Sequence, residues 1–325
     1  MRLSAQYCDQ DLRLEPGEWR ISQISSRPSC RAVSCDIEDQ VQFVHLTNIV
    51  PIESRIIGGT PASIDQYPFA AQIIVRGYLT CGGSLLTLRN VLSAAHCFFD
   101  WNNNLIRTRD VRVRAGTSNN NSGGTRLRVS RIAIHERYNM PLRDNDIAIL
   151  QTSSRFPRGS RIRLALIPFQ NDVVPDNSPL IHIGWGITWV HGQQLSPYLR
   201  HVPVLKINRE VCASRYQQLG VEQNSSFPVT ENMMCAGLLD LGGAGACRGD
   251  RGGPLLFNRT IVVGVVSWGH DCAHPQYPGV NMRVARYSNW INATVANLNG
   301  SPSVSESRVI LLFTLICAII HWHSS

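Results

Sequence analysis

The stretch that decides the fold is Gly249-Asp250-Arg251-Gly252-Gly253-Pro254, near the carboxyl end of the chain. Three shorter segments precede it in a fixed order. They are Ile56-Ile57-Gly58-Gly59 after Arg55, Ala94-Ala95-His96-Cys97, and Asp144-Asn145-Asp146-Ile147-Ala148. Each segment alone is a moderately specific signature of a fold, but the four segments in this order are a very specific one. They therefore guide the interpretation of the remaining sequence.

Short β-rich runs separated by Gly, Asn and Pro surround these four segments. The runs cover residues 70–75, 111–115, 126–134, 147–150, 180–183 and 261–267. Short strands with turn signals between them predict an all-β barrel or sandwich. Helical periodicity is scarce, and the one candidate helix, residues 287–297, is expected to close the domain.

Composition excludes several classes of protein. Apolar residues make up 43% of the 325 residues and charged residues 17%, which argues against a disordered or collagen-like chain. The longest apolar run, residues 309–320, covers roughly 18 Å as a helix, well short of a bilayer core of about 30 Å. A multi-span membrane protein is therefore excluded.

Arginine provides nearly all of the positive charge. The formal net charge is +8, and Lys206 is the only lysine. Residues 1–55 are slightly acidic, so the excess of arginine lies in the rest of the chain. This charge bears on solubility and on acidic partners, and it says nothing about the fold.

Residues 56–298 resemble a chymotrypsin-fold serine protease of the trypsin family. The resemblance rests on the four segments quoted above and covers about three quarters of the chain. It implies an all-β domain of two six-stranded antiparallel β-barrels with a short C-terminal helix. Residues 1–55, with mixed charge, three cysteines and no sustained period, are expected to be a pro-segment or a small poorly specified module, and residues 299–325 a spacer with an apolar tail.

The resemblance assigns two members of a catalytic triad. His96 takes the place of the general base, because an imidazole accepts a proton near neutral pH. Asp146 takes the place of the carboxylate that orients it. At the nucleophile the family has serine and this chain has Arg251. A guanidinium has no acceptor lone pair and stays protonated, so it cannot form an acyl-enzyme.

The substitution at Arg251 predicts a catalytically inactive homologue that acts by binding, as a decoy, cofactor or adaptor. Its expected partners are a protease, an inhibitor or another extracellular protein. The alternative is an active trypsin-like or chymotrypsin-like endopeptidase, if Arg251 is a variant or a sequence error, since one base change converts a Ser codon to Arg. A second alternative is a duplicate that folds and has no function. No cofactor or metal is expected.

The resemblance also places the substrate-binding groups. The peptide N–H groups of Gly249 and Arg251 correspond to the oxyanion hole. The strand segment Ser267-Trp268-Gly269 corresponds to the segment that binds a substrate backbone. The base of the S1 pocket falls at Gly245, with Gly269 and Gly279 as its walls and Arg248 at its mouth. We further expect Arg251 to point toward His96 and to pair with the Asp146 carboxylate.

The activation machinery is expected to be retained. Cleavage after Arg55 by an activating protease would free the Ile56 ammonium group to pair with Asp250. A buried and unpaired Asp250 would be costly, so the pair could still switch conformation in an inactive protein. The alternative is that an inherited Arg-Ile junction is cut without consequence.

The ten cysteines contain no Cys-x-x-Cys pair, which makes a zinc ribbon unlikely. By resemblance, three disulfides join Cys81 to Cys97, Cys212 to Cys235, and Cys247 to Cys272. Another common bridge of the family is missing on both sides, with Leu180 and Phe257 in place of its cysteines. The pairing of the remaining cysteines, Cys8, Cys30, Cys35 and Cys317, stays open.

Several signals favour an extracellular protein. Sequons for N-glycosylation stand at Asn120, Asn224, Asn258, Asn292 and Asn299. No signal peptide is visible in residues 1–20, and we expect the N-terminus to be incomplete. Small residues from Asn299, a polar spacer and the apolar run 309–320 together predict a glycolipid-anchor signal. A frayed, sticky C-terminus is the alternative.

Seven arginines fall within one 25-residue stretch. They are Arg107, Arg109, Arg112, Arg114, Arg126, Arg128 and Arg131. If 111–115 and 126–134 pair as a hairpin, four of these guanidinium groups could converge on one face. Such a face fits sulfated glycans or acidic proteins, and nucleic acid is not expected. The alternative is an ordinary solvated face. Residues 111–129 hold no carboxylate, so no calcium loop is expected there.

Overall fold

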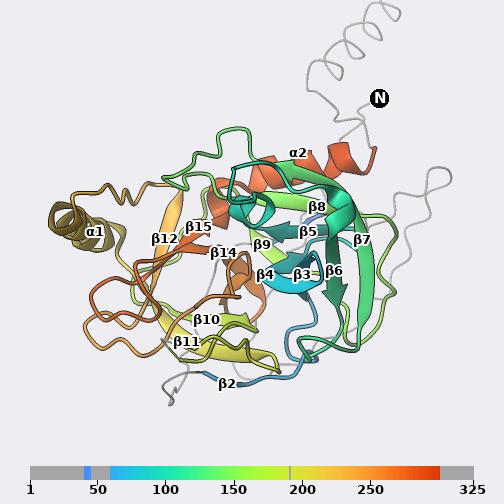
Figure 1. The fold of residues 1–325 in the computed structure, drawn as a ribbon, viewed down its shortest axis with the longest axis horizontal. Helices are drawn as coiled ribbons and strands as arrows, with labels where there is room; N and C mark the ends of the chain where they lie inside the picture. Colours follow the sequence, from blue (N-terminus) through green and yellow to red (C-terminus); the bar gives the residue numbers. More distant parts are fainter. Residues whose placement is uncertain (1–39, 45–58, 190–191, 301–325) are drawn as a thin grey trace, which may run out of the picture. The chain divides into compact units, whose positions relative to one another are not determined.

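Two closed β-barrels form most of the part of the chain that the computed structural model describes, residues 40–44, 59–189 and 192–300 (Figure 1). The first barrel closes in the order β3-β4-β5-β8-β7-β6, and every neighbouring pair is antiparallel. Its strands are β3 (Ala70–Val75), β4 (Tyr78–Leu85), β5 (Asn90–Ser93), β6 (Val111–Ala115), β7 (Thr125–Ile134) and β8 (Ala148–Thr152).

The second barrel also has six strands. β14 pairs with both β13 and β15, which closes the ring β10-β11-β12-β15-β14-β13. The strands are β10 (Pro179–Gly184), β11 (Arg200–Ile207), β12 (Met233–Gly237), β13 (Pro254–Phe257), β14 (Ile261–Trp268) and β15 (Gly279–Arg283). Two short strands, β2 (Thr60–Pro61) and β9 (Leu166–Pro168), pair with β11 and β14 at its margins. The all-β expectation of two six-stranded barrels is confirmed.

Strand sequence explains why these segments fold as they do. All six expected β-rich runs are strands, with ends shifted by at most a few residues. β3 and β8 are buried at every position, whereas β7 alternates between more and less exposed residues over its first half. The alternation follows from the two-residue period of a strand whose outer face meets water.

Two α-helices are present in the described residues, α1 (Arg209–Gln223) and α2 (Ser288–Leu298). α2 matches the expected terminal helix, but α1 was not expected. Its core-facing side chains are only Cys212, Tyr216 and Leu219, too few to reveal a stripe among polar residues. Asn208 caps this helix by accepting the Val211 N–H. Three short 3₁₀ turns complete the set, η2 (Ala95–Phe98), η3 (Thr108–Asp110) and η4 (Val284–Arg286).

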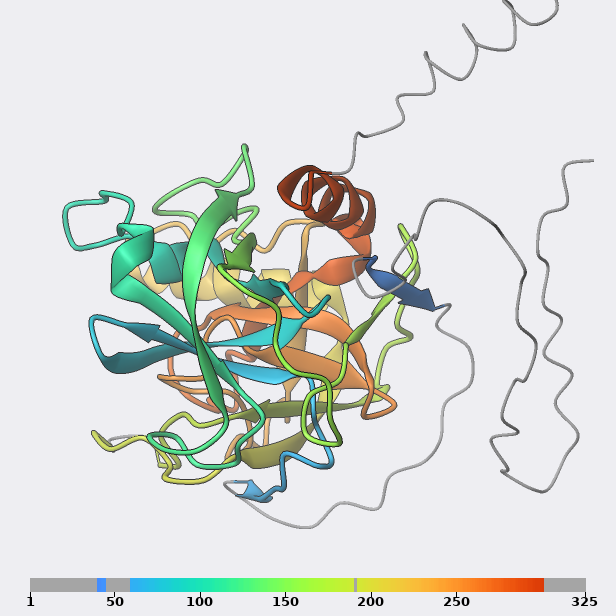
Figure 2. The same ribbon diagram turned by 90° about the vertical axis from the view of Figure 1, so that its right-hand side faces the viewer.

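Part of the expected pro-segment pairs with the second barrel. β1 (Gln42–Val44) lies parallel to β9, and Figure 2 shows it as a dark blue arrow at the edge of the sheet. Val41 is buried, and Phe43 stacks on Phe169 with ring centroids 5.6 Å apart. These apolar residues extend the sheet by one strand, which the sequence pattern did not indicate.

All three expected disulfides are present: Cys81–Cys97, Cys212–Cys235 and Cys247–Cys272. Each contributes about 2–4 kcal/mol to stability. Leu180 and Phe257 are direct cross-strand partners in β10 and β13, and both are buried. An apolar contact therefore occupies the position of the missing bridge.

Several expected features near the two ends of the chain lie in residues that the structure does not describe. Cys8, Cys30 and Cys35, the Arg55–Ile56 junction and the apolar tail all lie outside the described residues. Among the described helices, none has the length and apolar character needed to cross a membrane. The anchor and leader expectations therefore stay predictions.

Candidate active site

His96 lies just beyond the end of β5, on the 3₁₀ turn η2. The flanking Ala95, Cys97 and Phe98 are buried, and they hold the turn against the first barrel. The side chain of His96 is 11% exposed, so its ring is packed but still open on one side. This arrangement suits a group that must exchange protons with a bound molecule.

Asp146 lies two residues before β8 and is completely buried. Its Oδ2 lies 2.7 Å from His96 Nδ1, and its Oδ1 accepts the His96 peptide N–H at 2.8 Å. The hydroxyl of Ser267, on β14, donates a further hydrogen bond to Oδ2. Burial alone would raise the pKa of Asp146, but the charge and hydrogen bonds of His96 and the Ser267 bond hold it below its usual value.

The two residues before Asp146 fix its position. Asp144 accepts hydrogen bonds from Thr230 and Asn232 of the second barrel. Asn145 adopts a positive φ of 55° and donates to the Arg137 carbonyl. An Asn tolerates this left-handed conformation better than most residues. The Asp-Asn-Asp order therefore ties both barrels to the carboxylate beside His96.

Arg251 comes from the turn before β13, on the opposite barrel from His96. Its peptide carbonyl accepts the Gly82 N–H at 2.8 Å, which joins the two barrels at this point. The expected ion pair between Arg251 and Asp146 is not formed: within the described residues, His96 and Ser267 hold both carboxylate oxygens. Each oxygen already accepts at least one hydrogen bond, which leaves no pair of free sites side by side for a bidentate guanidinium.

Arg251 is nevertheless not extended into solvent. Its side chain is partly buried and borders two cavities that also share Trp268 and Gly269. Burial lowers the pKa of Arg251, Arg143 and Arg248 lower it further, and only Asp146 opposes them. An arginine guanidinium is not deprotonated in proteins, so Arg251 carries its positive charge at this site.

The residues of the expected oxyanion hole lie on this turn. Gly249 has a φ of 94°, a conformation that suits glycine. The Gly249 and Arg251 peptide N–H groups donate no hydrogen bond to other described residues. They are thus available as donors, and their role as an oxyanion hole stays a prediction.

The expected S1 residues are divided between two cavities. Ser267, Trp268, Gly269 and Gly279 line a cavity of about 130 Å³ together with Arg248 and Arg251. Gly245 lines a different cavity, of about 270 Å³, which surrounds Asp250. The neighbouring Ala246 borders the smaller one instead. The assignment of Gly245 as the pocket base stays a prediction.

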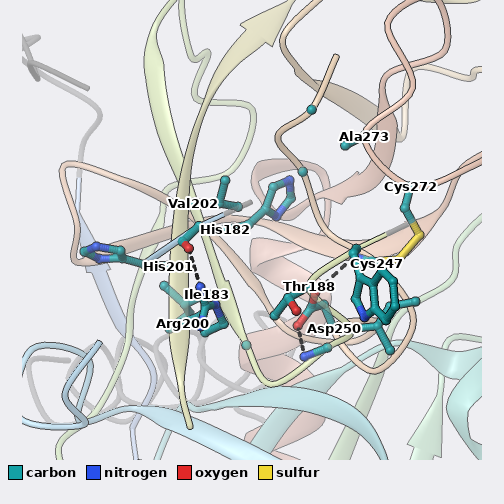
Figure 3. Close-up of a pocket in the computed structure, with 17 residues that line it drawn as sticks. His182, Ile183, Thr188, Arg200, His201, Val202, Cys247, Asp250, Cys272 and Ala273 are labelled. Atoms are coloured by element: carbon teal, nitrogen blue, oxygen red, sulfur yellow. Dashed lines mark hydrogen bonds between the residues drawn. A yellow bond between two sulfur atoms is a disulfide. The ribbon is translucent and has the colours of Figure 1, made fainter. Parts of the chain in front are cut away.

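The cavity around Asp250 is a second site of interest (Figure 3). The Asp250 carboxylate accepts the Gly186 N–H at 2.7 Å and the Cys247 N–H at 3.0 Å. Within the described residues no cation pairs with it, and burial raises its pKa to about 6 despite these bonds. Gly184 and Gly186 are required here, since a Cβ on either would approach the carboxylate within 2.5 Å.

His182 lines the same cavity from β10, and no sequence motif singled it out. It is 3% exposed, and neither ring nitrogen has a hydrogen-bond partner among the described residues. Burial lowers its pKa to about 4, so the ring is neutral at pH 7. His182 lies within the apolar run 180–183, and the sequence pattern gave no sign that its ring is buried and titratable.

The arginine-rich stretch forms the expected hairpin. β6 and β7 are antiparallel, with Arg112 opposite Arg128 and Arg114 opposite Arg126. Arg126 and Arg128 are exposed and Arg112 is partly exposed, whereas Arg114 is buried and donates to the Asn120 carbonyl at 3.1 Å. Three of the four guanidinium groups are thus accessible on one face.

The expected glycosylation and metal sites can also be placed. Asn224 and Asn292 are exposed and Asn258 is partly exposed, whereas the Asn120 side chain donates to the Ser196 carbonyl at 2.8 Å. The one cluster of potential metal ligands in the described part consists of Cys81, His96 and Cys97. Both of these cysteines are disulfide-bonded, so the cluster does not form a metal site.

Comparison with known proteins agrees with this geometry. The model of the family described as Trypsin matches residues 56–291. The chain is 40% identical over 246 residues to "Trypsin CFT-1" of Choristoneura fumiferana, covering 74% of this chain and 91% of that protein. It is 43% identical over 242 residues to "Trypsin, alkaline B" of Manduca sexta, covering 73% and 90%. It is 34% identical over 244 residues to "Vitellin-degrading protease" of Bombyx mori, covering 75% and 87%. With its two barrels and its His96–Asp146–Ser267 arrangement, the chain belongs to the trypsin family of serine proteases.

Proposed function

We propose that this protein is a serine protease homologue that forms no acyl-enzyme and acts by binding other proteins. The supporting observation is Arg251, which stands at the nucleophile position of a site whose His96 and Asp146 are otherwise in place. A guanidinium offers no lone pair to a scissile carbonyl. In the unrelated protease subtilisin, loss of the triad nucleophile costs about 10⁶ in turnover, which leaves little residual catalysis.

The alternative is an active endopeptidase with serine at position 251 in the functional protein. It is favoured by the intact contacts around His96, since the pair with Asp146 and the Ser267 bond are what a working general base needs. The relatives named above also carry the names of proteases. These observations keep proteolysis as the second candidate function.

A fluorophosphonate probe separates the two candidates. The probe would be applied to the native chain cleaved after Arg55 and, in parallel, to its Arg251→Ser variant. Labelling of the variant alone supports a sound site without its nucleophile. Labelling of the native chain would overturn the proposed function, and labelling of neither would mean that more than one residue has been lost.

We also propose that cleavage after Arg55 leads the Ile56 ammonium group into the cavity around Asp250. An unpaired buried carboxylate is costly, and a cation beside it would lower its raised pKa. The cavity has room for such a group, with a volume of about 270 Å³ (Figure 3). The expected activating protease is one that cleaves after arginine.

The hairpin arginines support a proposed contact with an anionic partner, either a sulfated glycan or an acidic protein. Arg112, Arg126 and Arg128 are the accessible members, and none has an ion pair with a described carboxylate.

We propose an extracellular location, which the three disulfides support because such bonds persist in oxidising compartments. Glycosylation and glycolipid anchoring remain part of this proposal.

A further inference from the structure

Arg251 and two further arginines line two adjoining cavities. Arg248 and Arg251 line the cavity of about 130 Å³, and Arg143 and Arg251 line a second cavity of about 530 Å³. Trp268 and Gly269 line both cavities, so the two spaces adjoin along the end of β14. We refer to the two cavities together as the arginine groove.

The arginine groove carries an unbalanced positive charge. Within 59–189 and 192–300, no carboxylate lies within ion-pair distance of Arg143, Arg248 or Arg251. The one carboxylate that lines the groove is that of Asp271, which is exposed and accepts the Cys272 N–H. Asp146 lies nearby, but His96 and Ser267 hold its oxygens.

Like charges gathered in a partly buried space repel one another, and this repulsion acts on Arg251. Arg143 and Arg248 both lower the pKa of Arg251, in addition to the effect of burial. A bound anion would relieve this repulsion and would gain charge-assisted hydrogen bonds from planar guanidinium groups. The groove thus favours a negatively charged occupant.

The remaining surface of the groove is suited to a peptide. Leu142, Phe227 and Pro228 line the larger cavity together with Arg143 and Arg251. The indole of Trp268 packs edge-on against Tyr216 at 4.8 Å between centroids, and its buried Nε1–H has no acceptor in the described part of the chain. Apolar and aromatic walls beside fixed donors are typical of pockets for side chains and backbone carbonyls.

We propose that the arginine groove binds an extended acidic peptide segment, with an aspartate or glutamate carboxylate held between Arg143 and Arg251. The inference rests on the proposed function, because a substrate carbonyl poised for attack and an Arg251 side chain cannot occupy the same space. It assigns to the groove an acidic partner protein, in place of a peptide to be cleaved.

The test is direct binding of a fluorescent eight-residue peptide with two central aspartates to the full chain, measured by anisotropy. The comparison peptide has asparagine at the same two positions. We expect the acidic peptide to bind about tenfold more tightly, with an affinity that falls as ionic strength rises. Arg143→Gln and Arg251→Ser should each remove most of this preference.

Arg163→Gln serves as the matched control, because Arg163 is exposed and lines neither cavity. It removes the same charge and should leave the preference unchanged. Equal binding of the two peptides, or no binding of either, would overturn the inference. Binding of a sulfated oligosaccharide in their place, lost in Arg143→Gln, would overturn it in favour of a glycan.

Fluorophosphonate labelling and peptide binding, both measured on the native chain after cleavage at Arg55, separate this inference from the proposed function. A native chain that labels but still prefers the acidic peptide would refute inactivity while keeping the groove specificity. A native chain that does not label and shows no preference would refute only the groove. Arg143→Gln keeps the test valid even if Arg251→Ser folds poorly, since Arg143 lies on a loop.

Discussion

Arg251 shows how much one side chain changes in an otherwise preserved site. The backbone around it keeps the link to Gly82 and leaves two peptide N–H groups, at Gly249 and Arg251 itself, without an acceptor among the described residues. The His96–Asp146 pair is also preserved. Arg251 thus changes the chemistry of the site while the hydrogen bonds of the His96–Asp146 pair are formed.

Ser267 is the residue whose importance is clearest only in the structure. Ser267→Ala removes one of three hydrogen bonds to the buried Asp146 carboxylate. We expect a loss of about 1.5–3 kcal/mol in the free energy of unfolding near pH 7, since the acceptor is charged. Denaturant titration measures this, and Ser130→Ala, at an exposed serine whose hydroxyl donates to the neutral Gln151 carbonyl, is the control. Equal losses in both variants would contradict the special role of Ser267.

The cavity around Asp250 predicts two opposing pH effects in the uncleaved chain. The folded-state pKa of Asp250 is raised from 3.8 to about 6, so its contribution to stability is present below pH 4 and is lost as pH rises toward 6. The folded-state pKa of His182 is lowered from 6.5 to about 4, so stability is lost as pH falls from 6.5 toward 4. Each shift corresponds to about 3 kcal/mol. The two pH dependences of the free energy of unfolding therefore nearly cancel between about pH 4 and 6.

Single substitutions should reveal each pH dependence of the free energy of unfolding separately. His182→Val leaves the Asp250 effect, so the free energy of unfolding should fall as pH rises from about 4 to 6. Asp250→Asn leaves the His182 effect, so the free energy should rise across nearly the same range. The other charged groups that line the cavity, Arg200 and His201, are unchanged in both variants. Urea titrations at several pH values give the slopes, and slopes of the same sign in both variants would refute this account.

At the scale of elements, the β6–β7 hairpin places like charges directly opposite each other. Arg128→Glu converts the cross-strand pair with Arg112 into an opposite-charge pair. We expect a gain of about 0.2–1 kcal/mol in stability at low salt, and weaker binding to a sulfated glycan column. Arg163→Glu is the control of equal charge change at an exposed site. A native chain that elutes with the Arg128→Glu variant would contradict an anion-binding hairpin.

At the scale of the whole molecule, β1 predicts the fate of the segment before Arg55. The apolar side chains in and just before β1 are Val41, Phe43 and Val44, each worth at most about 1.5–3 kcal/mol. After the cost of association, this supports a dissociation constant no tighter than about millimolar. Cleavage after Arg55 should therefore release the segment at micromolar concentrations.

Size-exclusion chromatography of the cleaved chain checks this release. The six described cysteines are all paired with one another, so none of them can hold the segment covalently. Reducing and non-reducing gels show whether another cysteine does. Co-elution at micromolar concentration without a disulfide would mean that residues outside β1 bind the domain strongly.

Sequence alone determined the barrels, the three disulfides, the terminal helix α2 and the positions of His96, Asp146 and Arg251. The all-β class and the helix follow from local patterning, whereas the two barrels, the disulfide pairing and the places of these three residues follow from the family resemblance that the four segments carry. The hairpin was also predictable, because a two-residue spacing of arginines fixes a shared strand face once the strands pair.

Only the tertiary structure decided which groups meet across the chain. Ser267 reaches Asp146 over a separation of 121 residues, His182 faces the Asp250 cavity, and Arg143 joins Arg251 in one groove. It also showed that the Asp146 carboxylate accepts hydrogen bonds from His96 and Ser267 and forms no ion pair with Arg251. The sequence pattern did not predict helix α1 or strand β1, because each buries only a few side chains. Long-range packing, burial and competition for a shared partner depend on the folded chain, and no local sequence pattern records them.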